Sequence, residues 1–100
     1  MTFEIFGRFD AKPGMESELQ RVILEVMAPT RAEPGCREIY FCRGLRDRAR
    51  FIIHSKWDSE AAFDAHAEMP HVKKFVASVA DLITHPMDVT RAEVVDEASR

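Results

Sequence analysis

Four histidines carry the clearest potential for chemistry in this sequence, because an imidazole takes up and releases protons near neutral pH. They stand at positions 54, 66, 71 and 85. His66 is the best candidate for a general base, since it shares a helical segment with Ala62 and Phe63, whose apolar face should point at a sheet. The alternative is a half-buried histidine that only packs and forms hydrogen bonds. No motif surrounds His54 or His85.

Further side chains could line a pocket for an aromatic substrate. Trp57 could stack on a planar ring, although tryptophan more often serves as a core anchor. Ser55 shares a strand face with Trp57 by alternation and could reach the same pocket. Phe63, on the apolar face of the His66 segment, would add to the wall. Tyr40 could donate a hydrogen bond to a substrate oxygen, but a place at a dimer contact is the preferred interpretation.

Two other places hold polar residues next to a turn or a helix start. His71 follows Pro70, where it is either at the mouth of a pocket or, as we prefer, an exposed cap. Arg31 and Glu33 precede the Pro34-Gly35 pair. A salt bridge between them would fix the corner between a helix and a strand, although Arg31 could also meet an anionic substrate.

The spacing of potential ligands argues against a metal site. No two histidines stand four residues apart, and the two cysteines do not form a Cys-X-X-Cys pair. Neither a phosphate-binding glycine loop nor a dinucleotide fingerprint occurs. We therefore predict no metal and no other cofactor. Cys36 and Cys42 would lie about 20 Å apart in one strand, too far for a disulfide, so both should be free thiols or small core residues.

Length and composition limit the class of protein. The 100 residues fit one domain spanning 1–100, with a frayed tail at 96–100. A formal net charge of −3 gives no electrostatic basis for binding nucleic acid. No segment reaches the roughly 20 apolar residues of a membrane span, and the first residues lack the basic and apolar regions of a signal peptide. We therefore expect a cytoplasmic protein without nucleic-acid or membrane partners.

Hydrophobic periodicity predicts strands at 2–11, 36–43, 49–57 and 87–95. A first helix should carry a buried stripe of Met15, Leu19, Val22, Ile23, Val26 and Met27. Pro29 should kink or end this helix, and the Pro-Gly pair ends it in any case. Asp58 or Ser59 can cap a second helix, and Pro70 can open a further helical segment. The stripe of that segment is Val72, Phe75, Val76, Val79, Leu82 and Ile83, and His85-Pro86 closes it.

The resulting order is β-α-β-β-α-β, an α+β arrangement of the ferredoxin-like type. Two helical regions can cover only one face of a four-stranded sheet. The strands nevertheless carry apolar side chains on both faces, with Phe6, Tyr40 and Ile52 opposite the other apolar residues. A large exposed apolar patch is uncommon on a monomer. We therefore predict a homodimer in which two such faces meet, sheet against sheet.

Several segments share residue patterns with a known family. They are Ala28-Pro29-Thr30-Arg31-Ala32-Glu33-Pro34-Gly35-Cys36, Phe51-Ile52-Ile53-His54-Ser55-Lys56-Trp57, Ala61-Ala62-Phe63, Ala65-His66, Pro70-His71 and Phe75. Over roughly residues 3–95 the chain thus resembles the antibiotic biosynthesis monooxygenase (ABM) domain family, especially its quinol monooxygenase-like members. The resemblance implies a dimeric α+β barrel. Enzymes of this family include cofactor-independent oxygenases that act on phenolic or quinol substrates with molecular oxygen, haem-degrading members and one that processes a phosphorylated autoinducer, so the resemblance is less specific for the reaction than for the fold.

Two departures from the family pattern bear on the reaction. Many members carry a glutamate two residues before the strand tryptophan, where this chain has Ser55. Haem-degrading relatives use an asparagine, a tryptophan and a histidine at positions that correspond here to Gly7, His66 and Val76. The resemblance therefore implies no haem-degrading activity, and it leaves open what orients a catalytic histidine.

The leading hypothesis is a cofactor-independent monooxygenase acting on a small aromatic, quinol or polyketide-like substrate, with His66 as the base. Two alternatives remain. One is an isomerase or other proton-transfer enzyme acting on a small carbonyl compound, which oxygen consumption would distinguish. The other is a non-catalytic dimer that binds a small molecule, an interpretation slightly favoured by Ser55 in place of the family glutamate.

Overall fold

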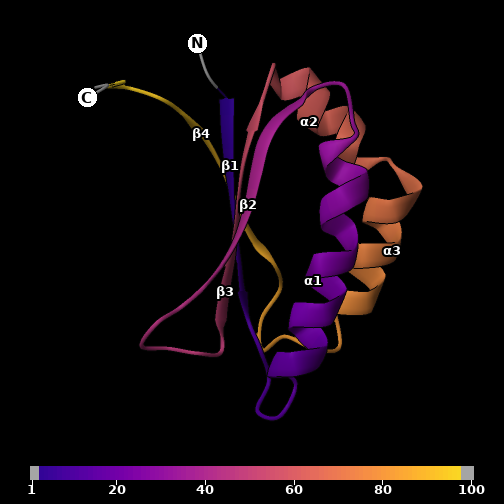
Figure 1. Ribbon diagram of the computed structural model, residues 1–100, viewed down its shortest axis with the longest axis vertical. Coiled ribbons are helices and arrows are strands. Elements are labelled where there is room, and N and C mark those ends of the chain that lie inside the picture. The colour runs from indigo at the N-terminus through magenta and orange to yellow at the C-terminus, as the bar shows by residue number, and fades with distance from the viewer. Residues whose placement is uncertain (1–2, 98–100) are drawn as a thin grey trace.

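A four-stranded sheet forms one layer of the molecule and three helices form the other (Figure 1). The computed structural model describes residues 3–97. In chain order the elements are β1 (Phe3–Asp10), α1 (Glu16–Arg31), β2 (Cys36–Arg43), β3 (Arg50–Trp57), α2 (Glu60–Ala67), α3 (Pro70–Val79) and β4 (Asp88–Glu93). The strand order is β2-β3-β1-β4, and each neighbouring pair is antiparallel. This confirms the predicted α+β, ferredoxin-like fold.

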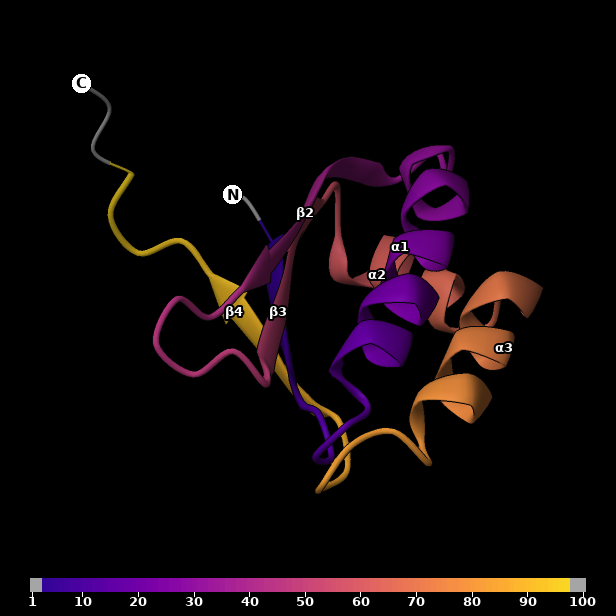
Figure 2. The ribbon, with the colours of Figure 1, turned by 60° about the horizontal axis from the view of Figure 1, so that its bottom comes forward.

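All three helices cover the same face of the sheet, and α1 packs beside α3 (Figure 2). Within one chain the sheet is open, with β2 and β4 at its edges, so it does not close into a barrel. Among residues 3–97, no helix combines the length and the apolar character needed to cross a membrane. The second helical region is divided, because α2 ends at Ala67 and Pro70 starts α3.

The first helix continues past Pro29 and ends at Arg31. Of the two effects predicted for Pro29, a kink or the end of the helix, the second is wrong. A proline this close to the C-terminal end removes a single backbone hydrogen bond, and the remaining residues still complete their last turn. The consequence is that Thr30 stays within the helix and is buried.

The last strand is shorter than predicted, since it spans Asp88–Glu93 instead of 87–95. Glu93 pairs with Phe3, the first residue of β1, and the ladder ends with that pair. Val94 and Val95 therefore lie beyond the strand, and Val95 is exposed. Thr2 of the predicted first strand and residues 98–100 of the predicted tail lie outside the described residues.

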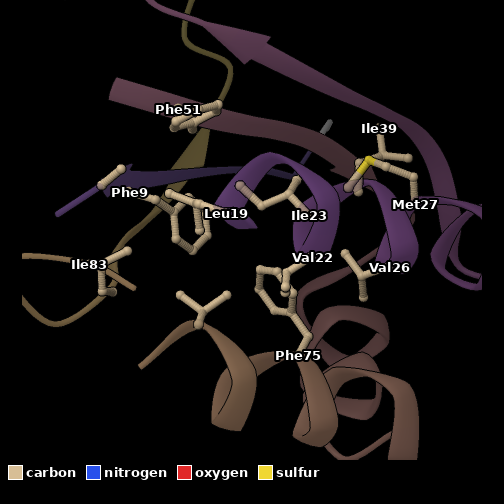
Figure 3. Packing of buried hydrophobic residues seen from close by; sticks show 12 residues of the cluster. Phe9, Leu19, Val22, Ile23, Val26, Met27, Ile39, Phe51, Phe75 and Ile83 are labelled. Atoms are coloured by element: carbon tan, nitrogen blue, oxygen red, sulfur yellow. The ribbon is translucent and has the colours of Figure 1, made fainter. Parts of the chain in front are cut away.

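The main hydrophobic core lies between α1, α3 and the covered face of the sheet (Figure 3). From α1 it includes Leu19, Val22, Ile23, Val26 and Met27, which recur at helical spacing as predicted. Phe9 and Phe51 of the sheet and Phe75 of α3 pack against them. Met15 and Val76, which the sequence pattern also placed in the stripes, are 38% and 42% exposed. Met15 is exposed because it precedes the first helical turn.

A close approach between two backbone segments positions the corner after α1. A Cβ atom on Gly35 would lie 2.5 Å from the Cβ atom of Ala62 in α2, a distance that van der Waals repulsion forbids. Only glycine therefore fits at this position without a shift of α2. The carbonyl oxygen of Gly35 also accepts a hydrogen bond from the backbone N–H of Asp58 at 3.0 Å. On the other side of this corner, Ser59 caps α2 by accepting from the N–H of Ala62 at 3.2 Å.

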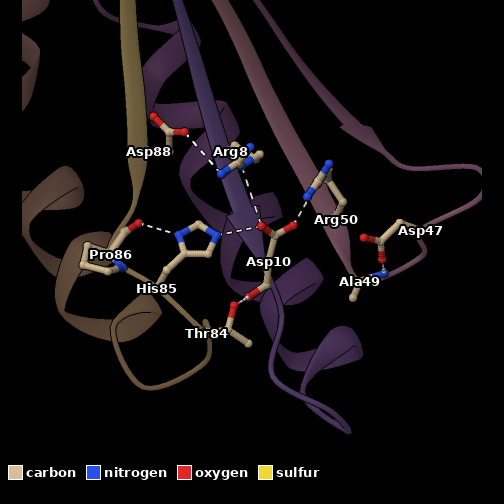
Figure 4. A network of polar contacts seen from close by, with 9 residues as sticks. All are labelled: Arg8, Asp10, Asp47, Ala49, Arg50, Thr84, His85, Pro86 and Asp88. Atoms are coloured by element: carbon tan, nitrogen blue, oxygen red, sulfur yellow. Dashed lines mark hydrogen bonds and ion pairs between the residues drawn. The ribbon is translucent and has the colours of Figure 1, made fainter.

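A polar network surrounds Asp10 at the C-terminal end of β1 (Figure 4). Asp10 accepts hydrogen bonds from Arg50 at 2.9 Å and from His85 at 2.6 Å. Nε of Arg8 lies 3.6 Å from Oδ2 of the same carboxylate. The hydrogen bond from Arg50 holds the pKa of Asp10 below its ordinary value, and His85 adds to this effect. The pKa of His85 is raised, first by its hydrogen bond to the carbonyl oxygen of Pro86 and then by Asp10. His85 thus has a structural role that the sequence did not reveal.

The face of the sheet turned away from the helices carries aromatic side chains with charged side chains next to them. Phe6 stacks on His54 with ring centroids 4.4 Å apart, and Tyr40 lies 5.9 Å from the same imidazole. His54 also contacts Glu4 at 2.6 Å, and the Tyr40 hydroxyl donates to Glu38 at 2.5 Å. Phe6 and Tyr40 are 41% and 47% exposed. The predicted two-sided apolar character of the sheet is therefore present.

Candidate active site

A cavity of about 260 Å³ lies between the sheet and the helix layer. Its wall is mostly apolar and receives side chains from all four strands and all three helices. The aromatic and larger aliphatic residues of this wall include Phe9, Met27, Ile53, Trp57, Phe63 and Phe75. A space of this size and character suits a small aromatic molecule, provided that a few polar groups fix its orientation.

Trp57, Phe63 and Ser55 form one connected part of the wall. The indole of Trp57 lies edge-on to the ring of Phe63, with centroids 5.6 Å apart. The indole N–H of Trp57 donates to the hydroxyl oxygen of Ser55 at 2.9 Å, and both residues are almost fully buried. Ser55 therefore satisfies the indole N–H of Trp57 and fixes the orientation of the ring.

Glu33 supplies a carboxylate to the histidine that the sequence singled out. It stands just after α1, and its oxygen Oε2 lies 2.6 Å from Nδ1 of His66 in α2. The two side chains are only 8% and 13% exposed. The imidazole of His66 also contacts the Trp57 indole, with ring centroids 4.7 Å apart, and it lines the cavity. Four predicted site residues, His66, Trp57, Ser55 and Phe63, thus meet around one space.

This contact assigns the two nitrogens of His66 different tasks. An ionised carboxylate can only accept hydrogen bonds, so Nδ1 of His66 must carry the hydrogen that Glu33 binds. In the neutral imidazole the lone pair is then on Nε2. A carboxylate placed in this way fixes the tautomer and the orientation of the imidazole. His66 thus remains the candidate general base that the sequence predicted.

His71 binds the same carboxylate from the outer side. Its Nε2 lies 2.8 Å from Oε2 of Glu33, and its side chain is 26% exposed. It lines a second, smaller cavity of about 120 Å³ that also borders Glu25 and Lys74, and it does not line the first. The preferred interpretation of His71 as an exposed cap misses this bond, and a direct contact with a ligand in the main cavity is not supported.

Tyr40 does not belong to the cavity. It lies on the face of the sheet turned away from the helices, where its hydroxyl donates to Glu38 and its pKa is raised chiefly by that hydrogen bond. The neighbouring residue Ile39 points to the covered face and lines the cavity. Alternation along β2 thus separates Tyr40 from the substrate-binding residues with which the sequence grouped it.

The sequence reasoning missed two residues of this site. It assigned Glu33 to a salt bridge with Arg31, but Glu33 contacts the two histidines, and Arg31 donates to the carbonyl oxygen of Ile39 at 3.4 Å. It did not consider Thr30, which lines the cavity and is 1% exposed. The spacing of Thr30 from Val26 along the helical stripe would have indicated its burial. No local signal connects Glu33 with His66.

Glu33, His66 and His71 also form the set of ligands in residues 3–97 that could hold a metal ion, with donor atoms within 4.8 Å of one another. Two imidazoles and a carboxylate are a common donor set for zinc or iron. Spacing along the chain did not reveal this set, because its members come from three segments.

The thiol of Cys36 is not suited to nucleophilic chemistry. Burial raises the pKa of this thiol, and the charge of Glu33 raises it further.

Comparisons with known proteins agree with the fold. Residues 2–78 match the family described as antibiotic biosynthesis monooxygenase. The chain is 34% identical over 95 residues to Rv0793 of Mycobacterium tuberculosis, covering 95% of this chain and 93% of that protein. It is 30% identical over 83 residues to YcnE of Bacillus subtilis, covering 83% and 87% of the two chains. Both relatives have names that describe them provisionally as monooxygenases.

A solved structure extends the similarity to the whole fold. The structure of Rv0793 aligns with a TM-score of 0.91 at 31% identity, covering 99% of this chain and 100% of that one. The family match and the relatives together cover the strands, the first helix and the histidine-bearing helix that build the cavity. We conclude that this chain belongs to the antibiotic biosynthesis monooxygenase family.

Proposed function

We propose that this protein is a cofactor-independent monooxygenase that oxidises a small phenol, quinol or related polyketide-like aromatic with molecular oxygen. The observation that carries the proposal is the contact between Glu33 and His66 at the edge of an apolar cavity. It combines an oriented base with a wall of aromatic side chains, and a phenolic substrate needs both. The membership of the chain in a family of monooxygenases supports the same reaction class.

The chemistry begins with proton transfer from the substrate hydroxyl to Nε2 of His66. The resulting phenolate passes one electron to oxygen, and the radical pair recombines to form a carbon–oxygen bond at a ring carbon that bears hydrogen. The imidazolium returns its proton to the peroxide. Loss of that ring hydrogen as a proton and cleavage of the oxygen–oxygen bond then give a carbonyl group and water. The substrate gains one oxygen atom and loses two hydrogen atoms, and the second oxygen atom leaves as water.

The cavity supports this sequence in two ways. Its volume of about 260 Å³ selects substrates with one or two rings over larger ones. Its apolar wall keeps water away from the radical pair, which would otherwise separate. In the wall, Trp57 and Phe63 offer ring faces and edges against which a planar substrate can stack.

We further propose that two chains form a homodimer through the uncovered face of the sheet. The stacked pair of Phe6 and His54, with Tyr40 beside it, gives this face an aromatic centre. The surrounding charges, among them Glu38 and Lys56, form a polar rim of the kind found around interfaces. A second sheet packed here would bury the centre and complete the barrel that one chain leaves open.

Oxygen uptake with a panel of small phenols and quinols tests the proposed reaction. For a substrate that responds, His66→Ala should lower turnover by roughly 10²–10⁴-fold, the usual contribution of a general base. His71→Ala is the matched control, because His71 binds the same carboxylate outside the main cavity. Turnover should persist in a strong chelator, and labelled dioxygen should place one atom in the product.

Other outcomes would contradict the proposal. If His66→Ala leaves turnover unchanged and lowers the free energy of unfolding by about 1–3 kcal/mol, His66 is a packing residue. If the protein converts a small carbonyl compound without consuming oxygen, the same base serves an isomerase.

A further inference from the structure

Two histidines contact the same carboxylate oxygen at the corner after α1. Nδ1 of His66 lies 2.6 Å and Nε2 of His71 lies 2.8 Å from Oε2 of Glu33. The first contact orients an imidazole that lines the main cavity. The second contact does not serve that purpose, since His71 borders a different, smaller cavity. A second imidazole on the same oxygen is therefore more than the proposed base requires.

The three side chains place a set of metal ligands within one small volume. Their donor atoms, a carboxylate oxygen and two imidazole nitrogens, all lie within 4.8 Å of one another. Ligands bound to a tetrahedral zinc ion are roughly 3.4 Å apart, because each lies about 2.0–2.2 Å from the metal. From the present contacts of 2.6 and 2.8 Å, each nitrogen would move away from Oε2 by roughly 0.6–0.8 Å. Small side-chain rotations are sufficient for such a change.

The backbone around the three ligands is held by hydrogen bonds. The carbonyl oxygen of Glu33 accepts from the N–H of Cys36 at 3.1 Å. His66 and His71 stand on either side of the short connection between α2 and α3, where the N–H of Met69 donates to the carbonyl oxygen of His66 at 3.0 Å. Because the ligands are already close together on fixed segments, binding an ion costs little conformational freedom.

The surroundings favour zinc over iron. Iron sites with two histidines and one carboxylate keep several further positions open for other ligands. Here Glu33 and His66 are largely buried and His71 is partly exposed, which suits three protein ligands and one water on a four-coordinate zinc ion. With both imidazoles neutral the set carries the negative charge of Glu33, which attracts a cation. In the small cavity beside His71, the charges of Glu25 and Lys74 offset each other.

We propose that Glu33, His66 and His71 bind one zinc ion per chain and that this ion inhibits the protein. Zinc on Nδ1 of His66 replaces the hydrogen that Glu33 binds in the free protein. The neutral imidazole then carries its hydrogen on Nε2 and has no lone pair left to accept a proton. The metal-free chain is the active form, so zinc is an inhibitor and not a cofactor. The inhibition rests on the proposed function, whereas the binding of zinc does not.

Titration calorimetry of the tag-free, chelator-treated protein with zinc chloride tests the site. The wild type should bind one zinc ion per chain. Glu33→Gln and His71→Ala should each weaken binding by at least about 100-fold, since even a residue that only orients a metal ligand is worth about 10- to 100-fold. His85→Asn is the matched control and should bind zinc as the wild type does, because His85 also contacts a carboxylate, that of Asp10 at 2.6 Å, but lies outside the ligand set.

Spectroscopy tests the position of the ion. In 15N spectra of the protein with labelled histidine, zinc should move the hydrogen of His66 from Nδ1 to Nε2. Cobalt(II) used in place of zinc should give the visible absorption of a four-coordinate ion, and His71→Ala should abolish this absorption.

Oxygen uptake with a responsive phenol tests the inhibition. Saturating zinc should lower turnover by roughly 10²–10⁴-fold, as the loss of a general base does, and a chelator should restore it. His71→Ala should turn over normally without zinc and should resist zinc, because the variant lacks one ligand.

Three results would overturn the zinc site: no binding at micromolar concentrations, equal weakening by His85→Asn and His71→Ala, or hydrogen that stays on Nδ1 of His66 when zinc is bound. Zinc that binds as proposed but leaves oxygen uptake unchanged would overturn the inhibition. Failure of the proposed function is a separate result. A protein that binds zinc through these three residues but oxidises no phenol keeps the metal site and its effect on the imidazole, and loses the oxygenase reaction.

Discussion

Glu33 and His66 lie 33 positions apart in the sequence, and yet Oε2 of the first is 2.6 Å from Nδ1 of the second. The carboxylate comes from the corner that follows α1. Its position allows Ser55 to be a serine without leaving the histidine unsupported. The contact thus answers how this chain orients its candidate base.

The carboxylate of Glu33 should be required for turnover more than for folding. We expect Glu33→Gln to lower the turnover of a responsive phenol by about 10- to 100-fold, because a neutral amide stabilises the imidazolium of His66 less than a carboxylate does. Oxygen uptake measures the rate, and 15N chemical shifts of the imidazole measure the fraction with hydrogen on Nδ1. The matched control is Glu68→Gln, which removes an exposed carboxylate with 76% side-chain exposure. Equal rates for the two variants would show that Glu33 is not part of the base.

The close contact at Gly35 should appear as a strong coupling between two substitutions. Gly35→Ala adds a Cβ atom 2.5 Å from that of Ala62, and such overpacking should cost about 1–3 kcal/mol of unfolding free energy. Ala62→Gly alone should cost about 1 kcal/mol through the lower helix propensity of glycine. The double variant should be more stable than the sum of the two losses predicts, as measured by urea unfolding. Additive losses would mean that the two segments do not touch in solution.

The network around Asp10 should make stability depend on pH in a defined direction. The folded-state pKa of His85 is raised above its ordinary value of 6.5, so its contribution is complete below that value and is lost as the pH rises through the raised one. The pKa of Asp10 is lowered from 3.8, chiefly by Arg50, so its contribution is present above 3.8 and is lost as the pH falls through the lowered value. The network should therefore stabilise the fold most between pH 3.8 and pH 6.5, the ordinary pKa values of the two groups.

Removing His85 isolates the alkaline side of that dependence. The difference in unfolding free energy between the wild type and His85→Asn should shrink as the pH rises from about 6 to 8, in a series of chemical denaturation curves. Arg50→Gln should alter the acid side instead, because Arg50 is the main cause of the lowered pKa of Asp10. A pH-independent difference for His85→Asn would contradict the assigned contacts of His85 with the carbonyl oxygen of Pro86 and with Asp10.

The dimer proposal predicts a mass of about twice 11.4 kDa in sedimentation at micromolar concentration. Tyr40→Glu places a charge at the centre of the uncovered face, next to His54, and should give monomers or aggregates because burying an unpaired charge is costly. Leu24→Glu is the control, since Leu24 is an apolar residue of α1 with 53% exposure outside this face. A stable, well-folded wild-type monomer at these concentrations would refute the sheet-to-sheet pairing.

The sequence by itself determined the order of elements and most of the core. Period-2 and period-3.6 patterns are local, so the strands, the stripe from Leu19 to Met27 and the break at Pro70 could be inferred without a structure. Local patterns also identified His66, Trp57, Ser55 and Phe63, because each lies on the apolar face of its own element. These residues meet as soon as the elements pack in the expected order.

Only the tertiary structure decided which groups act on one another. The contacts of Glu33 with His66 and His71 depend on the packing of the corner at Gly35 against α2, and nothing in the neighbouring sequence encodes that distance. Tyr40 lies outside the cavity because the helices cover the opposite face of the sheet. The unpaired hydroxyl of Thr30 could not be foreseen either, because hydrogen-bond satisfaction is a property of the surrounding atoms and not of the residue type.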